Sequence, residues 1–188
     1  MKKILIVILL SIVANMAFAQ VQVALGLKAG ANISKFDNAA YNNITSFHGG
    51  AFALFKLTKI GIQPEILLSQ QGSKFDDDSF GSLDLKASYL TIPVMIKLYL
   101  VAGLNLQAGP QFGFLTKAEL NGQDIKDTFK SSDISANIGL GWDLPFGLTL
   151  DARYNLGLSD VNNGISAESL KSRVVQISVG YKILKFGK

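Results

Sequence analysis

The stretch from Tyr89 to Leu100, YLTIPVMIKLYL, decides which folds this sequence can adopt. Its aliphatic residues stand at every second position from Leu90 to Leu98, which is the period of a β-strand, whose side chains alternate between two faces. The other face is mixed and includes Pro93 and Lys97. The pattern therefore predicts a strand with one wholly aliphatic face, which needs an apolar environment on that side only.

The same alternation recurs in seven further segments: residues 21–32, 47–57, 60–69, 104–114, 133–143, 148–158 and 174–183. The connections between these strands alternate strictly between short turns and long polar segments. The short turns are residues 58–59, 101–103 and 145–147, and the long segments are 36–46, 75–86, 117–132 and 160–172. An even number of strands with this alternation predicts an all-β fold, an eight-stranded antiparallel up-and-down transmembrane β-barrel with the four long loops on one rim.

The minor face of these strands is dominated by glycine and polar residues. A soluble barrel filled with such residues would have no core, whereas a barrel in a bilayer turns its aliphatic face to lipid and its polar face to the lumen. Closure also satisfies every strand edge, which lipid requires because it offers no hydrogen-bond partners. We expect Pro93 at a bulge or a locally broken ladder, and Lys97 in the lumen. A soluble lipocalin-like barrel is the alternative.

The N-terminus predicts export. Two lysines precede the apolar run of residues 4–13, and Ala17-Phe18-Ala19 is a small-x-small cleavage site, so we expect residues 1–19 to be a cleaved signal peptide and residues 20–188 to form one outer-membrane barrel domain. Removing Lys2 and Lys3 lowers the formal charge from +4 by two to +2, so no nucleic-acid partner is indicated. The absence of cysteine excludes disulfides and thiol catalysis.

Charged residues fall on the face that we assign to the lumen. Three interpretations are open: a selectivity lining, a catalytic group, or a core of paired polar side chains. We favour the polar core, because eight strands enclose a lumen just wide enough for side chains to fill. We expect Glu65 and Arg153 to meet across the lumen, with Lys97 beside Glu65. The predicted lumen polar network comprises Glu65, Lys97, Asp151, Arg153, Lys28, Lys56 and Asp143.

Catalytic and metal-binding patterns are weak. His48 is the only histidine, and a lipid hydrolase would need it beside a serine, for which Ser46, Ser69 and Ser88 are the candidates. A single histidine supplies too few ligands for a metal site. The run Asp76 to Asp78 lacks the spaced ligands of a calcium loop, so we expect no metal and no cofactor. Lysines between Lys117 and Lys130 are candidates for contact with lipopolysaccharide phosphates.

Several longer motifs resemble a known family. They are PEILLSQQG (Pro64 to Gly72), YLTIPVMIK (Tyr89 to Lys97), QAGPQFGF (Gln107 to Phe114), DARYNLGLSD (Asp151 to Asp160) and ISVGYKI (Ile177 to Ile183). Together they resemble the small outer-membrane protein β-barrel domain family, the PorT-like group of Gram-negative envelopes. The resemblance implies the bacterial outer membrane as location, outer-membrane lipids and lipopolysaccharide as surroundings, and the barrel-assembly machinery as a partner during biogenesis.

The biochemical roles within that family are mostly unassigned, so function must be predicted from what this sequence contains. No nucleophile, base and oxyanion donor converge in the pattern. We therefore expect a monomeric, non-enzymatic protein with a structural role or a surface-protein partner bound through its four extracellular loops. A narrow, porin-like channel and a lipid-modifying hydrolase that uses His48 are the alternatives.

Overall fold

The computed structural model describes residues 21–36, 41–42, 44–77, 81–120, 123–124, 132–158 and 172–187, so the signal peptide predicted at residues 1–19 lies outside it. The long strands are β1 (Val21–Phe36), β3 (Ile44–Leu57), β4 (Ile60–Asp77), β5 (Gly81–Tyr99), β6 (Leu104–Leu120), β8 (Ser132–Asp143), β9 (Leu148–Gly157) and β10 (Ser172–Phe186). The two-residue strands β2 (Tyr41–Asn42) and β7 (Gln123–Asp124) pair with β4 and β6.

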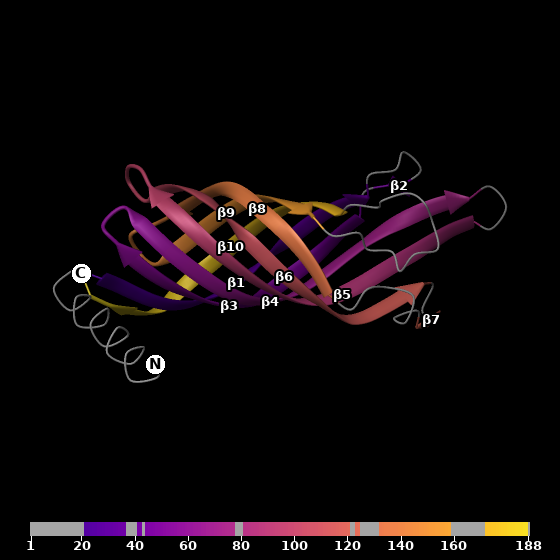
Figure 1. Cartoon of the computed structure of the whole chain (residues 1–188), viewed down its shortest axis with the longest axis horizontal. Coiled ribbons are helices and arrows are strands. Elements are labelled where there is room, and N and C mark those ends of the chain that lie inside the picture. Colours follow the sequence, from indigo (N-terminus) through magenta and orange to yellow (C-terminus); the bar gives the residue numbers. More distant parts are fainter. Residues whose placement is uncertain are drawn as a thin grey trace, which may run out of the picture.

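The strands form one closed antiparallel barrel (Figure 1). Each long strand pairs with the long strands before and after it in the chain, and β1 pairs with β10, which closes the ring. Closure leaves the eight strands of the ring without a free edge, so the predicted fold class is confirmed. No helix in the described part of the chain has the length and hydropathy of a membrane span.

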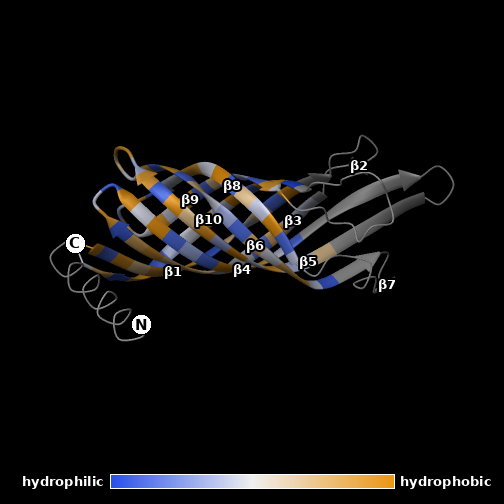
Figure 2. Ribbon diagram, viewed as in Figure 1, coloured by the Kyte–Doolittle hydropathy of each residue, from blue (hydrophilic) through white to orange (hydrophobic). Residues whose placement is uncertain are grey.

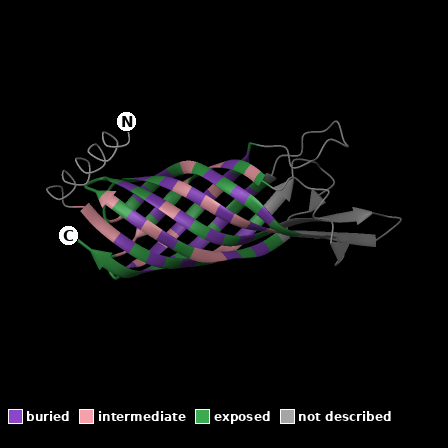
Figure 3. Ribbon diagram, turned by 60° about the horizontal axis from the view of Figure 1, so that its bottom comes forward, coloured by how far each residue is buried: buried purple, intermediate pink, exposed green. Residues whose placement is uncertain are grey.

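The two faces of the wall have opposite polarity. Hydrophilic and hydrophobic residues alternate along each strand (Figure 2), and the hydrophilic positions are the buried ones (Figure 3). Leu68 and Ile138 are 66% and 60% exposed on the outside, whereas Lys97 and Asn105 are 0% and 1% exposed inside. This inverts the arrangement of a soluble protein and matches a barrel whose outer face meets lipid.

Prolines interrupt the ladders without shifting them. The β4–β5 ladder has no pairs between Pro64–Val94 and Leu67–Thr91, next to Pro93, and the register is the same on both sides of the gap. Because proline has no N–H to donate, the missing pairs are the expected local cost. Of the two arrangements predicted for Pro93, the structure has the broken ladder rather than the bulge.

The rim at the ends of β3 and β4 near Thr58 carries the tight turns and is called the turn-bearing rim; the opposite rim is the loop-bearing rim. The prediction of a long loop at residues 75–86 is wrong at both ends of that segment. There β4 and β5 continue as a paired hairpin as far as Asp77 and Gly81. Residues 117–120 likewise belong to β6. The hydrophobic alternation ends earlier than the hydrogen-bonded ladder, so it marked the wall facing lipid and missed the strands' extensions.

Candidate functional site: the polar lumen

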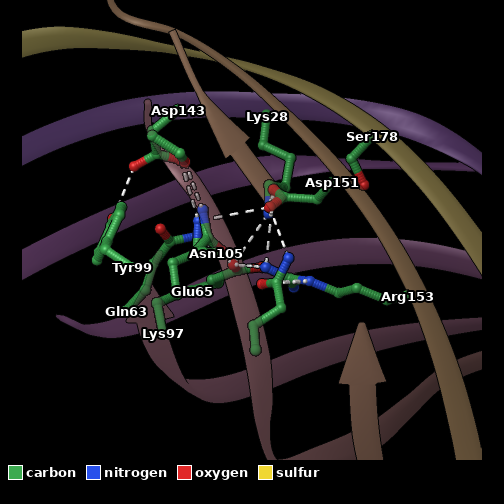
Figure 4. Close-up of polar contacts among 12 residues, drawn as sticks. Lys28, Gln63, Glu65, Lys97, Tyr99, Asn105, Asp143, Asp151, Arg153 and Ser178 are labelled. Atoms are coloured by element: carbon green, nitrogen blue, oxygen red, sulfur yellow. Dashed lines mark hydrogen bonds and ion pairs between the residues drawn. The ribbon is translucent and has the colours of Figure 1, made fainter. Parts of the chain in front are cut away.

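An ion pair between opposite walls lies at the centre of the lumen. Arg153 on β9 donates from Nη1 to Oε2 of Glu65 at 2.9 Å and from Nη2 to Oε1 at 2.6 Å, and Glu65 comes from β4. Lys28 on β1 donates to the same Oε1 at 3.0 Å, and Gln63 donates to it at 2.6 Å. The side chains of Glu65 and Arg153 are 0% and 1% exposed. Figure 4 shows these side chains converging from different strands.

Asp151 extends this centre toward the turn-bearing rim. Its Oδ2 lies 2.6 Å from Nζ of Lys28, and its Oδ1 accepts from Gln107 Nε2 at 2.8 Å. Lys97 Nζ is 3.4 Å from the same Oδ1 and 3.5 Å from Oδ1 of Asp143, so its contacts are longer than the others. Lys28 thus bridges two carboxylates on different strands, and Lys97 bridges a second pair.

Asp143 anchors the end of the network nearest the turn-bearing rim. Its Oδ2 accepts from Lys182 Nζ at 2.8 Å and from the Tyr99 hydroxyl at 2.7 Å. The ring of Tyr99 in turn lies under the ammonium group of Lys56, with 3.9 Å between Nζ and the ring centroid. The network therefore runs from the middle of the barrel to the turn-bearing rim and is held by charge-assisted hydrogen bonds.

The structure places all seven predicted network residues on the lumen side, but it changes some of their partners. Glu65 and Arg153 meet, whereas Lys97 does not lie beside Glu65, because the β4–β5 register pairs Lys97 with Gly61. Lys28 takes the place predicted for Lys97. Lys56 contacts the ring of Tyr99 rather than a carboxylate of the described network. Tyr99, Gln107 and Lys182 complete the network; the alternation had put them on the lumen face, but it gave no signal of their contacts.

A second polar cluster surrounds His48, nearer the loop-bearing rim. His48 Nδ1 lies 2.7 Å from Asn32 Oδ1, and its Nε2 lies 2.8 Å from Ser178 Oγ. The amide nitrogen Nδ2 of Asn32 donates to the main-chain oxygen of Gln70, and this oxygen can only accept. The amide orientation of Asn32 is thereby set, and the oxygen Oδ1 of Asn32 faces His48. The imidazole therefore carries its proton on Nδ1, and Nε2 accepts from the Ser178 hydroxyl.

The partners of His48 differ from those expected. Of the candidate serines, Ser46 donates to the main chain of Gln70 and Ser69 accepts from Asn32, so neither is the serine held by the ring. Ser178 was missed because it lies 130 residues away in sequence. Gly30 pairs with both His48 and Ser178, and a side chain on it would collide with the imidazole, so this glycine makes room for the contact.

The cluster has the order of a serine, histidine and asparagine triad, but its members are buried. His48 and Ser178 are 4% and 2% exposed, and both ring nitrogens are satisfied. The hollow that borders His48 is lined by residues of β3, β4 and β5, and Ser178 on β10 is not among them. The geometry favours a role in cross-linking β1, β3 and β10. The structure does not describe the side chains of Asp76 to Asp78, which the sequence offered as candidate calcium ligands.

An antiparallel barrel with an apolar exterior and a charged, hydrogen-bonded interior defines a class, the small outer-membrane barrels. The family model described as "Outer membrane protein beta-barrel domain" matches residues 18–163. The chain therefore belongs to this outer-membrane β-barrel family, and its location is the bacterial outer membrane. The match is to this domain family as a whole, and the PorT-like group stays a prediction. No curated relative matches the chain.

Solved structures support the fold. Neisserial surface protein A is similar with a TM-score of 0.60 and 14% identity, over 86% of this chain and 99% of that one. Ail, the attachment invasion locus protein of Yersinia pestis, solved with the heparin analogue sucrose octasulfate, is similar with a TM-score of 0.53 and 14% identity, over 89% and 99%. At this identity the likeness concerns architecture alone.

Proposed function

We propose that the protein is a non-conducting outer-membrane barrel that supports the membrane and displays its long connections to a partner at the cell surface. It has no catalytic role in this proposal. The observation that carries it is the ion-pair network across the lumen: Glu65, Arg153, Lys28 and Asp151 bridge three strands, β4, β9 and β1, with side-chain exposures of 0% or 1%. An ion crossing the barrel would have to break these charge-assisted contacts, which are strong in a low-dielectric interior.

Electrical recording tests the closed lumen. Purified, folded protein inserted into planar bilayers is expected to give no stable channel openings, with a reference porin as the positive control. The double variant Glu65→Ala/Arg153→Ala removes the central pair and shortens both side chains, so it should conduct where the wild type does not. Large, stable openings of the wild-type protein would refute the proposal and favour the porin-like alternative.

The surface role needs a separate experiment because it concerns a partner. A photoreactive amino acid placed between Lys117 and Lys130 should crosslink a surface partner or lipopolysaccharide in intact cells. The same amino acid at Phe146, an exposed position at the opposite rim, is the matched control. Identical crosslinked products at both positions, or none above background at residues 117–130, would contradict recognition through the loops.

The hydrolase alternative is tested at its own residues. The Ser178 hydroxyl is expected not to react with a fluorophosphonate probe, because it is buried and held behind His48. Lipid composition of cells carrying His48→Ala should equal that of wild-type cells at equal protein level. Labelling of Ser178 that is lost in His48→Ala would overturn the non-enzymatic assignment.

A further inference from the structure

The lipid-facing wall is not uniformly filled. Three hollows lie side by side on the outside of the barrel, with volumes of about 890, 550 and 360 Å³. The first shares Leu27, Ala51 and Ile66 with the second, and Gly49 and Leu68 with the third. They therefore form one continuous depression over β1, β3 and β4, which we call the β3 groove.

Small residues make the floor of the β3 groove. The strand registers place Val179, Ala29, Gly49 and Leu68 in one row across β10, β1, β3 and β4. The next row toward the turn-bearing rim has Ala51 on β3, between Leu27 and Ile66. Larger side chains thus flank a floor of glycine and alanine, which is a shape that lets a chain of methylene groups make van der Waals contact on three sides.

The groove is apolar along most of its length and polar at one end. Lys28 and Glu65 border it, but their side chains are 0% exposed and are paired inside the lumen. Toward the loop-bearing rim the third hollow is lined by Gln70 and Ser88, a pair on β4 and β5, and by the outward-facing ring of Phe47, which is 68% exposed. Amide and hydroxyl groups there can donate hydrogen bonds.

The last β3–β4 pair toward this rim is His48–Ser69, which is immediately below Gln70. The polar end of the groove therefore lies where the paired residues of β3 and β4 end. At the same level, the outward-facing residues of the groove change from apolar to polar. A membrane lipid has the same order, with oxygen-rich head groups at the surface and acyl chains below. This match of polarity along the groove selects a lipid over a second barrel, whose outer wall is apolar throughout the bilayer.

We propose that the β3 groove is a binding site for one membrane lipid. An acyl chain lies along Ala29, Gly49, Ala51 and Ala53, and the phosphate or ester oxygens of the head accept hydrogen bonds from Gln70 and Ser88. This lipid stays bound longer than the lipids around the rest of the barrel. The groove residues that contact the lipid in this proposal face outward, whereas His48, Ser69 and Tyr89 border the third hollow from the buried side of the wall.

Groove-filling substitutions test the acyl-chain part. Ala51→Leu places a larger side chain on the floor, and Ala152→Leu makes the same exchange at an exposed outward position on β9 that borders none of the three hollows. Gly49→Leu is the second filling variant. A Cβ at Gly49 would lie 3.5 Å from the Lys28 main-chain oxygen and 3.9 Å from Ala29 Cβ, so the wall tolerates it.

Native mass spectrometry of barrels released from nanodiscs of palmitoyl-oleoyl phosphatidylglycerol counts the retained lipid. Wild type and Ala152→Leu are expected to retain one lipid per barrel, with at least tenfold less retention in Ala51→Leu and Gly49→Leu. The head-end variant Gln70→Leu/Ser88→Ala should reduce retention at least threefold. Heat-modifiable gel mobility establishes folding of each variant.

Photocrosslinking with a phosphatidylglycerol that carries a diazirine in its acyl chain should label peptides of β3 and β4 above all others. Equal lipid retention in Ala51→Leu and Ala152→Leu, or labelling spread evenly around the barrel, would overturn the proposal. A barrel dimer that disappears in Ala51→Leu would overturn it in favour of a second copy.

Discussion

Replacing Glu65 by glutamine should be the most damaging single change in the lumen that preserves shape. The substitution keeps the size of the side chain but removes the charge that faces Arg153 at 2.6 Å and Lys28 at 3.0 Å. Both cations would then depend on Asp151, whose Oδ2 is 2.6 Å from Lys28 and 3.8 Å from Arg153. Removing one partner of a buried ion pair costs about 3–5 kcal/mol, because the other charge stays buried without compensation.

Urea unfolding in lipid vesicles measures this cost, with fluorescence of Trp142, the only tryptophan, as the probe. With a slope of about 2 kcal/mol per M, the midpoint of Glu65→Gln should fall by roughly 1.5–2.5 M. Lys59→Gln removes a charge from an exposed turn and should change the free energy of unfolding by less than about 0.5 kcal/mol.

A double-mutant cycle separates the ion pair from other effects of the substitution. Glu65→Gln/Arg153→Gln should be less destabilised than the sum of the two single variants by at least about 1 kcal/mol, since the double variant leaves no unpaired partner at this contact. If Glu65→Gln has the wild-type midpoint, or if the two substitutions are additive, the central pair does not hold the lumen together and the reasoning fails.

Three further predictions follow from the lumen geometry. Lys97→Met should lower the free energy of unfolding less than Glu65→Gln does in the same urea assay, because the carboxylate contacts of Lys97 are 3.4–3.5 Å long. In addition, the ion pairs of the described lumen residues join four cations, Lys28, Lys97, Arg153 and Lys182, to only three anions, Glu65, Asp143 and Asp151. A larger loss for Lys97→Met would contradict this. Gly30→Val should impair closure of the β1–β10 seam, seen as loss of heat-modifiable mobility, because a side chain there meets the imidazole of His48 and the main chain of Ile177, while Gly49→Val should fold as the wild type does. His48→Ala should lower the free energy of unfolding by about 1–3 kcal/mol, because Asn32 and Ser178 lose a buried partner; an unchanged urea midpoint would show that the cluster does not stabilise the seam.

The sequence determined the architecture because its signals are local. A period of two residues assigns each side chain to one of the two faces of the wall. The aliphatic face must be the outer one, because the other face is polar and could not meet lipid. The three tight turns fix the strands that they join as antiparallel pairs. Glu65, Lys97 and Arg153 could therefore be placed in the lumen without knowing any distance, and Lys182 lay on the same face.

The tertiary structure decided which of these lumen residues touch. Partners across a barrel depend on the stagger of all the strands between them, and a shift of two residues keeps every side chain on its face while it changes every neighbour. That is why Lys28 rather than Lys97 contacts Glu65, and why Ser178 contacts His48 across 130 residues. The β3 groove depends on the same stagger, because only the register brings Ala29 of β1 beside Gly49 of β3.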